Sequence, residues 1–131
     1  MFRRESKPQN RIDSLIGATT RIEGNLFFSG GLRPDGTVRG NVAALPDQPG
    51  TLVLSEHARI DGEVHAAHVV INGTVNGPVH ATESIELQAG CRVQGDVHYN
   101  SIEIVRGAVV EGRLVHHAAA EIKPAGLKLA S

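Results

Sequence analysis

The sequence has few of the large side chains that fill a wide hydrophobic core. Among its 131 residues there are no tryptophans, one tyrosine and three phenylalanines, although 40% of the residues are apolar. The apolar residues are therefore mainly valine, isoleucine, leucine and alanine. Side chains of this size suit a fold with a narrow interior.

Cysteine and long apolar runs are also scarce. Cys91 is the only cysteine, which excludes an internal disulfide and a zinc site built on a cysteine pair, and suits a reducing compartment. No apolar run approaches the ~18 residues of a membrane-spanning helix, and no signal-peptide core follows the N-terminal charges. The sequence therefore predicts a cytoplasmic protein.

The motifs of common enzyme classes are missing as well. There is no serine-histidine-aspartate order, no cysteine-histidine pairing and no Gly-x-x-x-x-Gly-Lys phosphate loop. Acidic and basic residues are interspersed along the repeat region, which indicates a solvated surface of mixed charge. We expect no catalytic residue, no cofactor and no nucleic-acid partner, and hence a protein that is not an enzyme.

What the chain does contain is one short pattern, written six times. An apolar residue, any residue, glycine, any residue and a second apolar residue follow one another, as in Ile60-Asp61-Gly62-Glu63-Val64. Successive glycines are 16, 22, 15, 18 and 17 residues apart, and the longest step contains an extra turn, Leu45–Gly50. Such a period indicates units that stack and bury their apolar faces on each other. The six glycines are Gly24, Gly40, Gly62, Gly77, Gly95 and Gly112.

Within each unit, apolar and polar residues alternate with the period of a β-strand. At about 3.3 Å per residue, a coil of 15 to 18 residues, the usual step between repeat glycines, accommodates three short strands joined by tight corners. Parallel crossovers are overwhelmingly right-handed. The sequence thus predicts an all-β fold, a right-handed parallel β-helix (β-solenoid) of about six coils. Its inward residues include Ile60, Val64, Val75, Val79, Val93, Val97, Val110 and Leu114.

The regular pattern predicts a β-helix domain over residues 12–115. Residues 1–11 carry four basic residues against the single acid Glu5 and show no period, which predicts a flexible basic tail. After Val115 the pattern fades, so we expect residues 116–131 to form a flexible C-terminal tail.

The order of single-glycine and double-glycine coils resembles that of the bactofilins, a family of bacterial polymer-forming cytoskeletal proteins. The resemblance is carried by Ile60-Asp61-Gly62-Glu63-Val64, Val69-Val70-Ile71-Asn72-Gly73-Thr74-Val75-Asn76-Gly77-Pro78-Val79 and Gly95-Asp96-Val97, and it covers roughly residues 16–115. Bactofilins are right-handed parallel β-helices with disordered tails that assemble end to end without nucleotide. The resemblance implies a cytoskeletal scaffold that forms filaments and supports cell shape or localises cell-wall enzymes.

Both ends of an open β-helix expose unpaired backbone groups and apolar side chains, and neither end of this repeat carries a strong block. We therefore expect this chain to be its own partner in an end-to-end homopolymer. The residues expected at the contacts are Ile16, Ile22 and Leu26 in the first coil and Val109, Leu114 and Val115 in the last.

The N-terminal segment resembles the short membrane-targeting segment of some bactofilins. Met1 and Phe2 form an apolar tip, with Arg3, Arg4 and Lys7 behind it. This arrangement predicts a peripheral location at the inner face of the cytoplasmic membrane, with anionic lipid as the partner.

Three of the seven histidines, His65, His80 and His98, lie three residues after their repeat glycines. Each follows an inward valine, so the alternation turns it to solvent, where stacked coils lie about 4.8 Å apart. A metal or acid-base site needs converging imidazoles with a second shell behind them. The pattern therefore favours an exposed ladder over a metal site.

Two other functional classes stay open. A left-handed β-helix enzyme, an acyltransferase or a carbonic anhydrase with histidine-bound zinc, needs an apolar residue at every sixth position, commonly followed at once by glycine; here glycine comes two residues later. A non-polymerising solenoid adaptor needs a contiguous exposed apolar stripe, which the sequence does not show.

Overall fold

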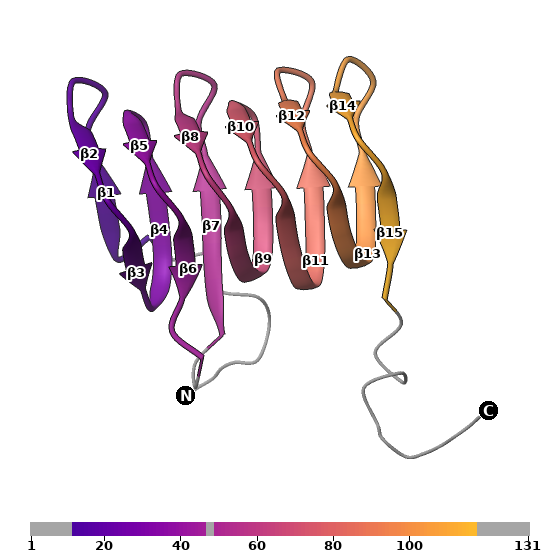
Figure 1. Ribbon diagram of the computed structural model, residues 1–131, viewed down its shortest axis with the longest axis horizontal. Helices are drawn as coiled ribbons and strands as arrows, with labels where there is room; N and C mark the ends of the chain where they lie inside the picture. The colour runs from indigo at the N-terminus through magenta and orange to yellow at the C-terminus, as the bar shows by residue number, and fades with distance from the viewer. Residues whose placement is uncertain (1–11, 47–48, 118–131) are drawn as a thin grey trace, which may run out of the picture.

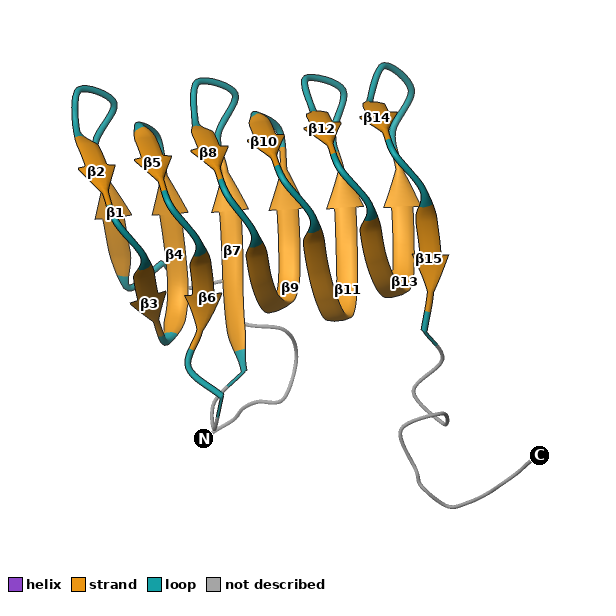
Figure 2. Ribbon diagram, viewed as in Figure 1, coloured by secondary structure: helices purple, strands orange, loops and turns teal. Residues whose placement is uncertain are grey.

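A computed structural model describes residues 12–46 and 49–117, and these residues wind into a coil of short strands (Figure 1). The described part contains fifteen strands and no helix (Figure 2), so none of its residues lies in a helix that could cross a membrane. The strands are β1 (Ser14–Ile16), β2 (Arg21–Glu23), β3 (Leu26–Phe28), β4 (Gly30–Pro34), β5 (Thr37–Arg39), β6 (Val42–Ala44), β7 (Gly50–Leu54), β8 (Arg59–Asp61), β9 (Val64–Ile71), β10 (Thr74–Asn76), β11 (Val79–Leu87), β12 (Arg92–Gln94), β13 (Val97–Ile104), β14 (Val109–Glu111) and β15 (Leu114–His116).

Three parallel walls enclose the core. The first wall consists of β1, β4, β7 and the later parts of β9, β11 and β13. The second consists of β2, β5, β8, β10, β12 and β14. The third consists of β3, β6, the earlier parts of β9, β11 and β13, and β15. The predicted all-strand, parallel β-solenoid of about six coils is confirmed.

Side chains of one kind stack on each other from coil to coil inside the walls. On the second wall Val38, Ile60, Val75 and Val93 pair in register and are completely buried. On the third wall the same holds for the column that contains Val64 and Val79, and each such side chain contributes roughly 1.5–3 kcal/mol of burial free energy. The predicted inward ladder is therefore confirmed in the middle of the domain.

The repeat glycines form a column along the corner between the second and third walls. A Cβ atom on Gly62 would lie 2.2 Å from the carbonyl oxygen of Gly40, and one on Gly77 would lie 2.3 Å from that of Gly62. Gly77 also has a φ of +155°, an angle that residues other than glycine rarely adopt. Each corner nests directly on the corner of the preceding coil, and this contact is the physical cause of the repeated glycine.

Turn length at the corner between the first and second walls explains the two shortest steps of the repeat. Wide turns are closed by hydrogen bonds such as that from the Ala58 N–H to the Ser55 carbonyl, 3.0 Å. Tight turns lie at Asp35–Gly36 and Asn72–Gly73, inside the glycine steps of 16 and 15 residues. The loops at the top of Figure 1 show the difference: wide at β1/β2, β7/β8, β11/β12 and β13/β14, and tight at β4/β5 and β9/β10.

The remaining expectations concern the ends and the insertion. The extra turn lies between β6 and β7, and residues 47–48 within it lie outside the described residues. The predicted N-terminal tail, residues 1–11, and residues 118–131 of the predicted C-terminal tail also lie outside them. Strand β15 runs one residue past the predicted domain boundary, to His116.

Candidate functional site: the open ends and a histidine column

At the C-terminal end of the solenoid, no described residue covers the inward columns. Strands β14 and β15 each have a partner on one side only among the described strands. Leu87 and Val97 are completely buried, whereas their in-register neighbours in the next coil, Ile104 and Leu114, are 50% and 44% exposed. Within residues 12–46 and 49–117, the last coil thus presents an apolar cross-section and strand edges whose backbone groups have no further strand to pair with.

The N-terminal end is open in the same sense. Strands β1, β2 and β3 pair only with β4, β5 and β6 among the described strands. Ile16 is buried, and Ile22 and Leu26 are half-buried and pack against the core. Two further large apolar residues of the first coil, Leu15 and Phe27, are 63% and 64% exposed.

The residues expected at the filament contacts all lie in the two end coils, but they do not all face the core. Leu114 continues an inward column, whereas Val109 pairs with Arg92 and Val115 with His98, both in outward columns. The expectation omitted Ile104 and Val110, which continue the inward columns of Leu87 and Val93. Val110 is among the inward residues that the sequence predicts, and strict alternation through the last repeat would have added Ile104. The residues expected at the membrane, Met1, Phe2, Arg3, Arg4 and Lys7, lie outside the described residues.

The predicted histidine ladder is present on the third wall. His65, His80 and His98 pair in register, and their rings stack with centroids 4.3 Å and 4.4 Å apart and interplanar angles of 6° and 10°. His117 continues the stack, with its ring 5.1 Å from that of His98 and its Nε2 2.9 Å from the Nδ1 of His98.

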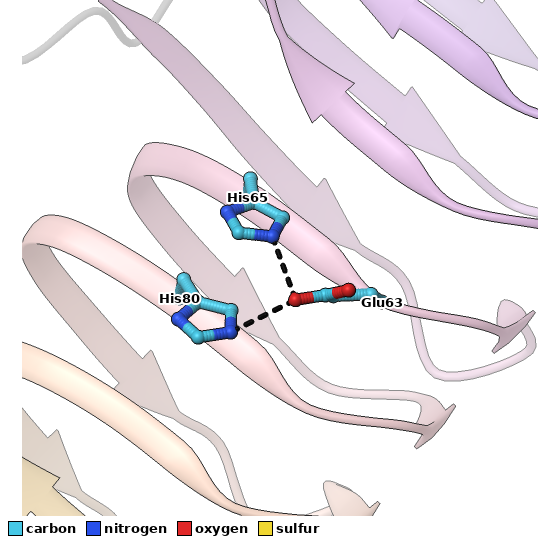
Figure 3. A group of neighbouring side chains, drawn as sticks. All are labelled: Glu63, His65 and His80. Carbon is cyan, nitrogen blue, oxygen red and sulfur yellow. Dashed lines mark hydrogen bonds and ion pairs between the residues drawn. The ribbon is translucent and has the colours of Figure 1, made fainter.

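Glu63 adds a carboxylate to this column. Its Oε2 lies 2.8 Å from the Nε2 of His65 and 3.0 Å from the Nε2 of His80 (Figure 3). The hydrogen bond from His65 holds the pKa of Glu63 below its ordinary value. Burial, followed by electrostatic repulsion from the neighbouring His65 and His98 side chains, lowers the pKa of His80. At neutral pH the cluster therefore combines an ionised carboxylate with a neutral His80 imidazole.

Glu63 and His117 are the members of this column that the sequence did not reveal. Glu63 follows a repeat glycine, and that position holds asparagine twice, then glutamate, proline, aspartate and arginine in the six repeats. No regularity marks it. His117 lies beyond the last repeat, and only the fold brings it back onto His98.

Two neighbouring features complete the surface. Leu45, Pro46 and Pro49 of the extra turn line one side of an open depression that also includes His65 and Ala66. Cys91 is 2% exposed, and burial raises the pKa of its thiol to about 11. Because the reactive form of cysteine is the thiolate, Cys91 acts as a core residue.

Comparison with known proteins supports the assignment that the fold suggests. The family model Bactofilin, described as polymer-forming cytoskeletal, matches residues 14–115. Bactofilin BacP of Myxococcus xanthus (strain DK1622) is 30% identical over 109 residues, which are 83% of this chain and 44% of BacP. Bactofilin BacO of the same strain is 28% identical over 102 residues, which are 78% of each chain. No solved structure gives a significant match.

The matched region begins with β1 and ends within β15, so it coincides with the solenoid itself. The chain spans less than half the length of BacP and about three quarters of that of BacO. The repeated corners, the all-parallel walls and the extent of the match together place this chain in the bactofilin family of polymer-forming cytoskeletal proteins.

Proposed function

We propose that copies of this chain join through their open ends into filaments that need no nucleotide, and that the protein is a scaffold and not an enzyme. The filament lies at the inner face of the cytoplasmic membrane, where it supports cell shape or localises cell-wall enzymes. The observation that carries this proposal is the pair of unfinished inward columns at the two ends of the solenoid.

Burial and backbone pairing favour the end contact. Ile104 and Leu114 are each about half exposed, and a second copy stacked on them removes apolar surface from water at about 25 cal/mol per Å². The free edges of β14 and β15 gain hydrogen bonds to the partner, each with a net value of about 0.5–1.5 kcal/mol. A contact at each end leaves the assembly open, so it continues into a filament.

The bactofilin resemblance favours joining of like ends, which gives a filament without polarity. In that arrangement the first coils of two copies meet around Ile22 and Leu26, and the last coils of two copies meet around Ile104 and Leu114.

Attachment to the membrane is assigned to residues 1–7. Met1 and Phe2 enter the headgroup boundary, and Arg3, Arg4 and Lys7 each gain about 1 kcal/mol near an anionic leaflet. One tail binds weakly and reversibly, but a filament displays many tails, so that attachment is multivalent.

Negative-stain electron microscopy of the purified full chain without ATP or GTP tests the assembly. We expect filaments from the unaltered protein, and short oligomers or single subunits from Ile104→Glu and Leu114→Glu. Both side chains are exposed in the single subunit, so these changes should preserve the fold while placing a charge in the contact.

A matched control adds the same charge away from the ends. Thr74 is an outward residue of the second wall and pairs with Arg59 and Arg92 in the adjacent coils, so Thr74→Glu should leave filaments intact. A strictly monomeric unaltered protein at high concentration would contradict the proposal and favour an enzyme or an adaptor. Unimpaired filaments from both end variants would also contradict it.

A further inference from the structure

We propose that Glu63, His65 and His80 form a binding site for a zinc-like divalent transition-metal ion on the side of the solenoid. Their three ligand atoms lie within 4.8 Å of one another. They come from two successive coils, because His65 lies in β9, His80 lies in β11, and Glu63 lies just before β9 (Figure 3).

The donor atoms converge as they do around a metal ion, but without metal they are held together by hydrogen bonds to the Glu63 carboxylate. Both imidazole Nε2 atoms face the same carboxylate oxygen, at 2.8 and 3.0 Å. In a tetrahedral zinc site, bonds of about 2.0–2.2 Å place ligand atoms about 3.3 Å apart. The three side chains are 30–49% exposed, so small rotations can open the carboxylate contacts and bring the two imidazole nitrogens together.

The scaffold restricts where these side chains can go. His65 and His80 pair in register on adjacent strands, and the residues before them, Val64 and Val79, are completely buried. The ring of His98 stacks on His80 at 4.4 Å and limits its rotation. A site on packed strands holds its geometry better than one on a loop.

Donor chemistry selects the class of ion. Two imidazoles and one carboxylate suit Zn²⁺, Ni²⁺ or Cu²⁺, whereas Ca²⁺ and Mg²⁺ require mostly oxygen ligands. Water completes the coordination from the solvent side, where the depression beside the extra turn includes His65. A bound ion links two coils, so it should also stabilise the solenoid, since a ligand that binds only the folded state raises its stability.

Isothermal titration calorimetry of the full chain with ZnCl₂, and with CaCl₂ and MgCl₂ for comparison, tests the site. We expect one zinc ion per chain, no measurable binding of Ca²⁺ or Mg²⁺, and at least tenfold weaker zinc binding in Glu63→Gln, His65→Gln and His80→Gln. Co²⁺ provides a second readout, because its visible absorption becomes much stronger when the ion leaves octahedral water for a four- or five-coordinate protein site, and this increase should be lost in His65→Gln.

The matched control is His57→Gln. His57 is an exposed histidine whose Nε2 lies 3.5 Å from Glu56, and it has no second imidazole stacked on it among the described residues, so its loss should leave zinc affinity unchanged. Thermal melting without metal shows whether each variant folds. His65 is the most exposed of the three proposed ligands, so His65→Gln still tests the site if His80→Gln fails to fold.

Three results would overturn the proposal. The first is an absence of zinc binding to the unaltered chain. The second is a zinc affinity in both Glu63→Gln and His65→Gln that lies within twofold of the affinity of the unaltered chain. The third is loss of zinc binding in His98→Gln together with full affinity in His65→Gln. The last result would assign the ion to the His98 and His117 pair.

Discussion

Asp96 shows how one side chain fastens a coil to the next. Its Oδ1 accepts a hydrogen bond from the Arg113 backbone N–H at 2.9 Å, and its Oδ2 lies 3.2 Å from the Arg113 guanidinium. Asn25 and Asn41 occupy the same place after their repeat glycines, and each accepts a backbone N–H from the following coil, at 3.0 and 2.9 Å. Where this position holds Asn25, Asn41 or Asp96, its side chain accepts a hydrogen bond from the next coil, and Asp96 is the titratable one of these three.

Acid should loosen this fastening. The backbone hydrogen bond from Arg113, supported by its side chain, holds the pKa of Asp96 below the ordinary value of 3.8. A carboxyl whose folded pKa is depressed stabilises the fold above its unfolded pKa, and this contribution is lost as the pH falls through the folded value. Between pH 6 and pH 3, we expect the melting temperature of Asp96→Asn to fall less than that of the unaltered chain. The reason is that the amide keeps the hydrogen-bond acceptor but does not titrate.

Melting curves followed by circular dichroism at both pH values provide the measurement. Equal losses of melting temperature in Asp96→Asn and the unaltered protein would show that Asp96 has no part in the acid sensitivity.

Among the structural elements, the tight turns depend most on their neighbours. The tight turn at Asn72–Gly73 packs against the preceding wide turn, so a Cβ atom on Gly73 would lie 2.4 Å from the carbonyl oxygen of Ser55 and 2.5 Å from that of Ala58. Both atoms belong to backbone, which cannot move aside without breaking the hydrogen bonds of the coil. A tight turn thus nests between two carbonyl groups of its neighbour and shortens its own coil.

Gly73→Ala should therefore destabilise the fold by about 1–3 kcal/mol, the usual cost of an overpacked interior. Gly17→Ala is the matched control, since Gly17 lies in a wide turn and its added Cβ would meet only Thr20 Oγ1, at 3.8 Å. Urea denaturation of the two variants gives the free energies of unfolding. Equal stabilities would mean that the turns do not depend on this close packing.

At the scale of the whole molecule, the proposed scaffold couples two weak interactions. In this proposal the open ends provide assembly and residues 1–7 provide the contact with lipid, and each tail by itself binds too weakly to hold the protein at the membrane. Membrane binding should then depend on filament length. A substitution at the ends of the solenoid should therefore weaken membrane binding even though it does not touch the lipid-binding residues 1–7.

Co-sedimentation with anionic liposomes tests this coupling. The combined change Phe2→Ala, Arg3→Ser and Arg4→Ser should abolish most pelleting, since it removes the apolar tip and two charges of about 1 kcal/mol each. Leu114→Glu should also reduce pelleting while leaving the tail intact. Neutral liposomes are the control, and undiminished pelleting of the triple variant would exclude the proposed tether.

Local alternation and the repeated glycines determined most of the fold. Ile60, Val75 and Val93 alternate with polar neighbours in the sequence. This alternation directs them inward regardless of which residues the adjacent coils contribute, and all three are buried. Each repeat glycine marks a corner, because only glycine permits the contact with the glycine before it. The resemblance to bactofilins rested on this same order of corners.

Only the tertiary structure decided which side chains from different coils meet. Glu63 and His80 are brought together by the length of one coil, which a tight turn shortens, and His117 reaches His98 from beyond the last repeat. The exposure of Ile104 and Leu114 depends on the absence of a following coil among the described residues, and no local pattern contains that information. Alternation specifies whether a side chain faces inward, whereas its neighbours along the solenoid depend on how turn lengths align one coil on the next.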